Sequence, residues 1–385
     1  MPQKDIKKFS RISKKYKIAI IGHSVLEIRQ QLFIKKLKKY FNLSLHVPQD
    51  SQNIILKDSR VKIFKYKSIF PKRQQICFMF NLCKNLKKEN PDYVIVWAEP
   101  WYFISQELNL SYPKNRIHFV FENLKKPKNP IFKIIEKISF RKTNILVAAS
   151  ETSKKIYRIK GYNGIIKVFP MVGIDTKKFR KFNEKKRLQL KRKYNLENKK
   201  VVLFAGRLIK EKGISYILQA FLVVNKKIKN SVLLFAGEGP EKKTIEKFSK
   251  KYNLQKNIIL LGKIDYLKMP QIYNLADVFV YPSIATRKWA EQFGYSMIEA
   301  SLCGVPVIAT NSGSIPEILK IGIIIPEKNS DALSKAIINL LLNKKIYKKM
   351  SKNGAKFYKK YDIDNIVKKY LCLVNKRVKY KLNSK

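Results

Sequence analysis

VVLFAGRLIKEKG, residues 201–213, joins an apolar run to a basic loop that is bounded by glycines. The run VVLFA at 201–205 is typical of a strand that is buried on both faces of a parallel sheet. A helix is expected to begin near Ile214, so the loop would connect the carboxyl end of a strand to the amino end of a helix. This order predicts an α/β domain whose ligands bind at the carboxyl edge of its sheet.

Short apolar runs separated by helix-like segments extend over both halves of the chain. In the second half, strands are expected at 201–206, 232–237, 257–262, 277–283, 306–310 and 322–326. In the first half, strands are expected at 17–22, 93–98, 117–121 and 144–150, with helices over 26–40 and 76–88. Two such series predict two doubly wound domains, and 385 residues are more than one hydrophobic core usually organises.

Polar composition places the boundary between these domains. Residues 176–200 are dense in Lys and Arg, which suits an interdomain connection followed by a short surface helix. The expected segments are a first domain at 1–175, the connection at 176–200, a second domain at 201–345 and a helical segment at 346–385. The last segment is too long for a simple cap, and we expect it to pack back on the first domain.

The loop GRLIKEKG at 206–213 has the residue types of an anion site. Arg207 and Lys212 could reach one anion together, and the flanking glycines allow the backbone to approach it closely. The amides of the following helix would add to the attraction. In so basic a protein, a solvated turn is the alternative interpretation.

A second candidate segment is EQFGYSMIEASLCGVPVIAT at 291–310. Glu291 precedes a Phe293–Gly294 turn, and Glu299 lies inside the helix that is expected to follow. At roughly 1.5 Å per residue, Glu299 would lie about 7 to 8 Å along the helix axis from Gly294. The two carboxylates would then hold different parts of one ligand, a spacing that argues against simple glycoside hydrolysis. The alternative is a helix with an acidic approach and a half-exposed Glu299.

These two segments, with LLFAGEGP at 233–240 between them, resemble glycosyltransferase family 4, also called glycosyl transferases group 1. The resemblance runs to residue 319 and covers nearly all of the second half. In the first half, GYNGIIKVFPMVGIDTKKF at 161–179 resembles the approach to the family's interdomain linker. That match is looser, because VGID at 172–175 replaces the asparagine-glycine-valine-aspartate sequence that is common there.

The resemblance implies a GT-B architecture, in which two Rossmann-like doubly wound domains face each other across a cleft. It also implies that the C-terminal domain holds a nucleotide sugar and that transfer retains the anomeric configuration without a metal or other cofactor. By the same resemblance, Arg207 and Lys212 would grip the donor diphosphate, and Glu299 would bond the ribose hydroxyls. Glu291 and the Phe293–Gly294 amides would address the donor sugar and its phosphate. The glycines of the implied donor site are Gly22, Gly206 and Gly237.

The acceptor side of the implied site lies in the first half. Many family members carry a histidine after a strand in the middle of this domain, and the corresponding segment here reads HFVFEN at 118–123. His118 is expected to point into the sheet. Glu122, at the carboxyl end of the strand, is the expected residue near the transferred sugar, as in members with a Glu-Asn sequence. Glu99, in WAEP at 97–100, either faces the cleft or has a bland surface role.

The predicted function is therefore a metal-independent retaining glycosyltransferase of hexosyltransferase type. It would move a sugar from a UDP- or GDP-sugar to a glycan or lipid-linked acceptor in the synthesis of cell-surface polysaccharide, lipopolysaccharide or glycolipid. A sugar-phosphate synthase or a phosphorylase-type enzyme of the same fold is an alternative. A nucleic-acid-binding protein is a distant one, because the sequence shows no recognisable RNA or DNA module and no nucleic acid is expected.

Charge and cysteine content limit which other partners and cofactors are expected. The formal charge is +55, from 82 basic and 27 acidic residues, and it fits either an anionic membrane surface or a compositional bias toward lysine. Four scattered cysteines and three histidines show no spacing typical of zinc sites or disulfides. No apolar run reaches the roughly 18 residues that span a bilayer. A cytoplasmic protein, peripheral on the inner face of the membrane, is expected.

Overall fold

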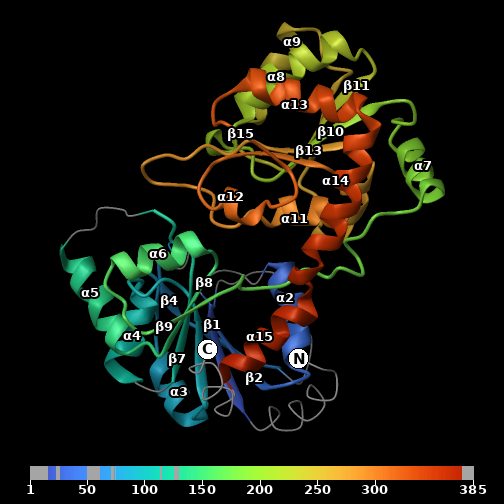
Figure 1. The fold of residues 1–385 in the computed structure, drawn as a ribbon. Helices are drawn as coiled ribbons and strands as arrows, with labels where there is room; N and C mark the ends of the chain where they lie inside the picture. The colour runs from blue at the N-terminus through green and yellow to red at the C-terminus, as the bar shows by residue number, and fades with distance from the viewer. Residues whose placement is uncertain are drawn as a thin grey trace. The chain divides into compact units, whose positions relative to one another are not determined.

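The computed structural model describes residues 16–22, 27–49, 61–70, 73, 75–112, 115–124 and 130–374. The chain forms two compact units, which Figure 1 shows with the elements labelled. The first unit comprises residues 1–173 and 363–385, and the second comprises residues 174–362. Within the described residues, no helix has both the length and the apolar character needed to cross a membrane.

The first unit is built on a parallel sheet whose strand order is β3-β2-β1-β6-β7-β8-β9. Its strands are β1 Lys17–Gly22, β2 Asn42–Pro48, β3 Val61–Tyr66, β6 Tyr93–Trp97, β7 Arg116–Val120, β8 Ile145–Ala148 and β9 Ile165–Val168. Its helices are α2 Ile28–Leu37, α3 Leu82–Glu89, α4 Phe103–Ser111, α5 Pro130–Arg141, α6 Glu151–Ile159 and α15 Ile363–Val374. A short hairpin pairs β4 Ser68–Ile69 with β5 Phe78–Met79.

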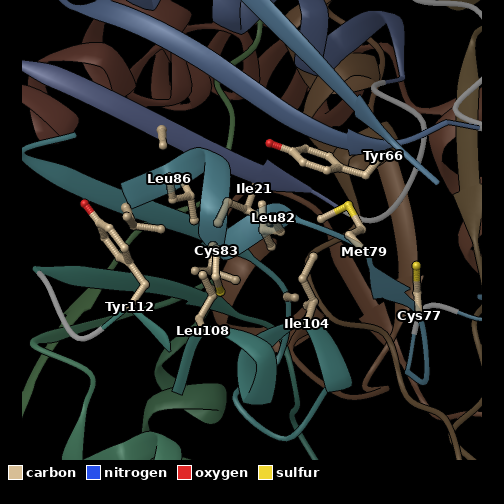
Figure 2. Close-up of a cluster of buried hydrophobic side chains, with 14 residues drawn as sticks. Ile21, Tyr66, Cys77, Met79, Leu82, Cys83, Leu86, Ile104, Leu108 and Tyr112 are labelled. Carbon is tan, nitrogen blue, oxygen red and sulfur yellow. The ribbon is translucent and has the colours of Figure 1, made fainter. Parts of the chain in front are cut away.

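One core of the first unit lies between the sheet and helices α3 and α4. Figure 2 shows Ile21 of β1 facing Leu82 and Leu86 of α3, with Ile104 and Leu108 of α4 in the same cluster. Each pair of helical leucine or isoleucine positions is four residues apart, so both members project from one face of their helix. This spacing explains why these two short segments fold as helices against the sheet.

Helix α15 returns to the first unit through an aromatic cluster. The ring of Tyr370 stacks on Phe119 at 5.0 Å and meets Phe33 edge-on at 5.0 Å. The Tyr370 hydroxyl donates a hydrogen bond of 2.6 Å to the Met171 carbonyl. Of the segment 346–385 that was expected to pack back on the first domain, residues 363–385 belong to this unit and residues 346–362 belong to the second.

The second unit is built on a parallel sheet of order β12-β11-β10-β13-β14-β15. Its strands are β10 Lys200–Ala205, β11 Ser231–Ala236, β12 Ile258–Gly262, β13 Val278–Tyr281, β14 Val307–Thr310 and β15 Ile323–Ile325. Its helices are α7 Glu184–Lys193, η1 Lys210–Lys212, α8 Ile214–Lys227, α9 Lys242–Lys251, η2 Tyr266–Lys268, α10 Met269–Leu275, α11 Tyr295–Leu302, α12 Ile315–Ile318, α13 Ser330–Leu342, α14 Lys344–Phe357 and η3 Tyr358–Tyr361. The strand order reverses between β10 and β13, which makes their carboxyl ends the topological switch point of the sheet.

The segment expected to be an interdomain connection, 176–200, lies in the second unit. Its helix α7 is tied to the start of β13, because Arg187 and Lys191 bind the Asp277 carboxylate at 2.6 and 3.1 Å. The same carboxylate accepts a 2.7 Å hydrogen bond from the Val201 amide of β10. These contacts give α7 a fixed place on the second sheet.

The prediction of two doubly wound α/β domains is confirmed, and every predicted strand is present. The helix expected over 76–88 begins only at Leu82, because Phe78 and Met79 pair with the preceding strand in the hairpin. Strands β2, β3 and β9 were not among those expected from the sequence.

Candidate functional site

The candidate site of the second unit lies at the switch point between β10 and β13. The loop after β10 contains Lys212, β13 ends at Tyr281, and Glu291 precedes helix α11. The Lys212 ammonium donates to the Tyr281 hydroxyl at 2.6 Å and to the Glu291 carboxylate at 2.5 Å. The Tyr281 hydroxyl in turn donates to Glu291 at 2.9 Å, and the Ser283 hydroxyl donates to it at 3.2 Å. Residues separated by up to 79 positions thus meet at one point.

This ion pair is buried, and burial changes the pKa of Lys212 and of the neighbouring Tyr281. Burial lowers the pKa of Lys212 below its usual range, although the Glu291 carboxylate opposes the change. Burial, together with the Glu291 charge, raises the pKa of Tyr281 well above its usual value. The Lys212 ammonium also lies 4.5 Å from the centre of the Tyr281 ring and 4.9 Å from that of Trp289. A positive charge is therefore fixed at the switch point by aromatic and acidic neighbours.

Arg207 lies in the same loop and is exposed to solvent. Its charge is one of the influences that lower the pKa of Lys212, after burial, so the two cations lie close enough to repel each other. A dianion placed beside them would relieve this repulsion. That Arg207 and Lys212 reach one anion together stays a prediction.

Gly206 and Gly237 follow the neighbouring strands β10 and β11 directly and allow their loops to touch. The Gly206 amide donates to the Ala236 carbonyl at 3.0 Å. A Cβ atom at Gly237 would lie 1.9 Å from the Gly206 carbonyl oxygen, so the two atoms would clash. A glycine is therefore required at 237 for the carboxyl edge of the sheet to keep this shape.

Helix α11 begins beside Glu291 without a side-chain cap. Gly294 precedes its first residue with φ at +73°, in the left-handed region that favours glycine. Gly294 is the N-cap residue, and it has no side chain that could cap the helix. Phe293 is buried and packs against Tyr295 and Tyr361, with ring centres 4.7 and 5.5 Å away. The ring of Phe293 is thus part of the core of the second unit, and the role of the Phe293–Gly294 amides stays a prediction.

Glu299 lies one turn inside α11 and is 2% exposed. Its two carboxylate oxygens accept hydrogen bonds from the Tyr266 hydroxyl at 3.0 Å and the Tyr273 hydroxyl at 2.9 Å. Tyr266 belongs to η2 and Tyr273 to α10, so both come from the connection between β12 and β13. These bonds hold the carboxylate in place, and its predicted contact with a ribose stays a prediction.

The tyrosines and the serine around these carboxylates were not identified from the sequence. Tyr281 and Ser283 lie in the run DVFVYPS at 277–283, where they read as the end of a buried strand. Tyr266 and Tyr273 are 33 and 26 residues from their partner, so spacing along the chain does not connect them to it. The available signal was the position of Tyr281 at the carboxyl end of the strand beside the loop that contains Lys212.

The first unit places Gly22 at its own switch point. Gly22 ends β1 and is in register with Trp97, the last residue of the neighbouring strand β6. A Cβ atom at Gly22 would make only an ordinary contact with the Trp97 ring, at 3.8 Å. Its position agrees with a loop near a ligand, but steric contacts within the described residues do not demand glycine there.

Glu122 follows β7 and takes part in a buried network of charges. One carboxylate oxygen accepts a 2.9 Å hydrogen bond from the Trp101 indole, and the other pairs with the Lys160 ammonium. Lys160 also pairs with Glu136 at 3.1 Å. Burial lowers the pKa of Lys160 to about 8. Glu122 is thus held by two neighbours and is not a freely rotating carboxylate.

Glu99 and His118 are buried and make contacts within the first unit. One Glu99 oxygen accepts hydrogen bonds from the Phe121 and Glu122 amides at 2.8 and 3.1 Å, and the other accepts one from the Tyr157 hydroxyl. Glu99 thereby fixes the turn that presents Glu122. His118 is fully buried in β7, as expected, and burial lowers its pKa to about 3. It would remain neutral over the physiological range.

Among the described residues, no group of three or more His, Cys, Asp or Glu side chains is arranged to hold a metal ion. In the second unit, the structure brings Lys212 and Glu291 into contact and gives Glu299 separate tyrosine partners. Gly22 and Glu122 belong to the first unit.

Comparison with known proteins identifies relatives of this region. Residues 186–357 match the family model described as glycosyl transferases group 1. A GDP-mannose-dependent alpha-(1-6)-phosphatidylinositol monomannoside mannosyltransferase of Mycobacterium tuberculosis is 29% identical over 177 residues, which cover 45% of this chain and 46% of that protein. An N-acetyl-alpha-D-glucosaminyl L-malate synthase of Bacillus anthracis is 27% identical over 187 residues, 47% of each protein. The chain thus spans about half the length of these relatives.

Solved structures with a similar fold match nearly the whole chain. The Anabaena protein HepE, in complex with UDP, has a TM-score of 0.75 at 16% identity and covers 96% of this chain and 100% of its own. A sucrose-phosphate synthase from Thermosynechococcus elongatus has a TM-score of 0.72 at 18% identity, over 92% of this chain and 97% of its own. At these identities the likeness concerns the fold, and it confirms the pair of Rossmann-like domains of the GT-B class. Residues 186–357, which lie in the second unit, are similar in sequence to the glycosyl transferases group 1.

Proposed function

We propose that the chain is a glycosyltransferase that takes a sugar from a nucleotide-sugar donor and that its second unit binds the donor. The observation that carries this proposal is the arrangement at the second switch point. There, the buried Lys212–Glu291 pair lies beside the exposed Arg207 and the first turn of α11, which follows Gly294. A diphosphate is the part of a nucleotide sugar that such a collection of cations and amides would bind.

Arg207 and Lys212 would stabilise the leaving group. Breaking the bond between sugar and phosphate leaves a nucleoside diphosphate on which negative charge grows. Lys212 is held in place by Tyr281 and Glu291, so its charge needs little reorganisation as the bond breaks. By the scale of losing one preorganised donor, removal of Arg207 should cost about 3 kcal/mol of transition-state stabilisation.

The two glutamates would serve different ends of the donor. Glu299 is held as a hydrogen-bond acceptor by two tyrosine hydroxyls, which suits a carboxylate that receives bonds from the two hydroxyls of a ribose. Glu291 lies at the phosphate end, and with the Phe293–Gly294 amides it would orient the donor sugar. A retaining, metal-independent reaction is part of this proposal, with the departing phosphate taking the proton of the acceptor hydroxyl.

The acceptor would be a glycan or a lipid-linked sugar, in the synthesis of cell-surface polysaccharide, lipopolysaccharide or glycolipid. The Mycobacterium tuberculosis relative is named for a phosphatidylinositol mannoside, which supports a lipid-linked class. Glu122 would lie near the transferred sugar, held by Trp101 and Lys160. The donor nucleotide would be UDP, as in the HepE complex, or GDP, as in the name of the mannosyltransferase.

A thermal-shift titration with UDP, GDP, ADP and CMP, without divalent metal, tests this proposal. A nucleotide at about 100 times its dissociation constant stabilises the protein by roughly 2.7 kcal/mol. We expect a shift with one nucleotide that is lost in Arg207→Ala and kept in Lys226→Ala, an exposed position on α8. If no nucleotide shifts the unfolding temperature while RNA binds strongly at low salt, the proposal is wrong and the charge has another purpose.

A further inference from the structure

Helix α5 of the first unit exposes a stripe of isoleucines. Ile131, Ile134 and Ile138 are 63%, 60% and 42% exposed. They are three and four residues apart, so they lie along one face of the helix. Scattered exposed apolar residues are normal on protein surfaces, but three large ones in a row on one helix are not.

The opposite face of α5 is firmly attached to the unit. The Ser139 hydroxyl donates to the Pro100 carbonyl at 2.6 Å, and Glu136 is buried against Lys160 at 3.1 Å. Phe140 is also buried, with its ring 6.0 Å from that of Tyr157. The helix is therefore held in its rotation, and its isoleucine stripe is exposed because the fold presents it.

Basic residues accompany the stripe. Lys133, Lys137 and Arg141 are exposed on the same helix. The helix contains a single acidic residue, Glu136, and that carboxylate is buried with Lys160. The outward surface of α5 thus combines apolar side chains with positive charge and presents no carboxylate.

The neighbouring helix α4 adds to this surface. Helices α4 and α5 pack against each other, as Figure 1 also shows, and the Asn109 carbonyl of α4 accepts a 2.5 Å hydrogen bond from Lys142. The next residue, Leu110, is 86% exposed. An apolar side chain therefore lies near the carboxyl end of α5. We call Ile131, Ile134, Ile138 and Leu110, with Lys133, Lys137 and Arg141, the α5 surface.

We propose that the α5 surface binds an anionic lipid bilayer. Amphipathic helices that lie in a membrane interface place apolar side chains among the acyl chains, with Lys and Arg beside anionic headgroups. The α5 surface offers both features, and a long lysine or arginine side chain can reach the headgroups while its stem stays with the isoleucines. A soluble protein partner would be favoured by complementary acidic and basic pairs, and the α5 helix presents no exposed carboxylate. The inference rests on the proposed function for its purpose, since a lipid-linked acceptor is reached at such a surface.

Sedimentation with lipid vesicles tests the proposal on the full chain. We expect binding to phosphatidylcholine vesicles that contain phosphatidylglycerol, weak binding to phosphatidylcholine alone, and a decrease with salt. The double variant Ile131→Ser/Ile134→Ser should bind at least about tenfold more weakly, and so should Lys133→Gln/Lys137→Gln. Matched changes on α8 of the second unit, Val223→Ser and Lys226→Gln/Lys227→Gln, should leave binding unchanged.

Insertion of the stripe has its own measurement. Tryptophan fluorescence of an Ile134→Trp variant should be quenched by brominated acyl chains more than that of the parent, whereas a Val223→Trp variant should gain no quenching. If Lys226→Gln/Lys227→Gln on α8 weakens vesicle binding as much as Lys133→Gln/Lys137→Gln does, net charge alone causes the binding, and the proposal is overturned. Self-association of the chain that is abolished by Ile131→Ser/Ile134→Ser, without vesicle binding, would assign the α5 surface to protein contact and also overturn it.

Nucleotide titration of the same preparations separates this inference from the proposed function. The α5 variants should keep the nucleotide-induced thermal shift of the parent, because the donor site belongs to the other unit. If the parent protein shows a thermal shift with a nucleotide but binds no vesicle, the membrane proposal is wrong and the proposed function stands. If it binds anionic vesicles but no nucleotide, the proposed function is wrong and the membrane proposal stands.

Discussion

At the scale of single residues, Lys212 and Glu291 depend on each other. A lysine ammonium in a buried position is costly, and the adjacent carboxylate compensates part of that cost. Tyr281 joins them, since its hydroxyl accepts from Lys212 and donates to Glu291. The charge state of Lys212 is therefore set by its partner as well as by its burial.

Glu291→Gln should make donor binding more sensitive to alkaline pH. The protonated Lys212 attracts a diphosphate, so affinity falls as pH rises through the pKa of Lys212. Burial already lowers that pKa, and Glu291 opposes the change, so loss of the carboxylate should move the fall to lower pH. Calorimetric titration with a nucleoside diphosphate at about pH 7 and about pH 9 should show a variant weaker by about tenfold at the higher pH. An exposed control, Glu197→Gln, should follow the parent. Identical pH profiles for parent and Glu291→Gln would contradict the coupling.

Glu107 of α4 should make the first unit less stable at alkaline pH. Burial raises its pKa to about 7, although the Met79 amide, 3.1 Å from the carboxylate, opposes the rise. The folded state thus holds this proton more tightly than the unfolded state, and the stabilisation present at acid pH is lost as pH rises through about 7.

Glu107→Gln should remove this dependence. In urea unfolding at about pH 8, the variant should be more stable than the parent by about 2 kcal/mol, and at about pH 4 the two should be equal. The exposed Glu151→Gln should show no such difference between the two conditions. A variant that is less stable at alkaline pH would show that the Glu107 carboxylate is stabilising there.

The sequence pointed to Lys212, Arg207 and Glu291 because charged residues in loops after apolar runs stand out, and to Glu299 through the family resemblance of the helix that contains it. It did not identify the hydroxyl partners of the carboxylates, because their contacts depend on how distant loops converge at one sheet edge. Glu122 was expected near a ligand, but its partner Lys160 follows helix α6 and lies 38 residues further along the chain. Sequence patterns therefore show where a charged residue lies along the chain, but its partners can be identified only from the tertiary structure.

At the scale of elements, the carboxyl ends of β10 and β11 meet through glycines. Gly237→Ala should be strongly destabilising, because its Cβ would lie 1.9 Å from the Gly206 carbonyl oxygen. Gly262→Ala, at the end of β12, has a positive φ of +67° but no atom closer than 4.0 Å to the added carbon. It should cost about 1 kcal/mol for the backbone conformation alone. Urea unfolding that gives equal losses for the two variants would show that the close approach does not matter.

Strands were predictable where both faces are apolar and were missed where polar residues are buried. In β2, Ser44 and His46 interrupt the apolar pattern, yet both are buried. The His46 ring is hydrogen-bonded to Ser44 at 3.0 Å and to Tyr66 at 2.7 Å, and it meets Glu89 at 3.0 Å. These partners satisfy the polar groups, so the strand can be internal. Strands β3 and β9 are partly exposed, with lysines among their apolar residues.

At the scale of the whole molecule, the chain leaves the first unit near residue 173 and returns to it at Ile363. Helix α15 completes the first unit, since Tyr370 packs among Phe33, Phe119 and Phe169. The stability of that unit therefore depends on residues at the far end of the sequence.

Tyr370→Ala should destabilise the first unit and spare the second. Loss of a buried aromatic side chain costs about 3 to 5 kcal/mol, and the hydroxyl bond to Met171 is lost as well. Hydrogen exchange should accelerate in β7 and α2 but not in β10 or β11. Tyr252→Ala, at a residue 39% exposed, is the control and should change neither. Equal acceleration in both sheets would mean that the units unfold as one.

Hydrogen–deuterium exchange with a bound nucleotide tests the central claim, that the second unit holds the donor. With the nucleotide that raises the unfolding temperature, amide protection should rise in 206–213 and in the segment from Glu291 to Glu299, and Arg207→Ala should abolish it. The matched variant Lys226→Ala should keep the protection. Protection confined to the carboxyl edge of the first sheet, with 206–213 and 291–299 unchanged, would contradict the account and place the donor in the first unit.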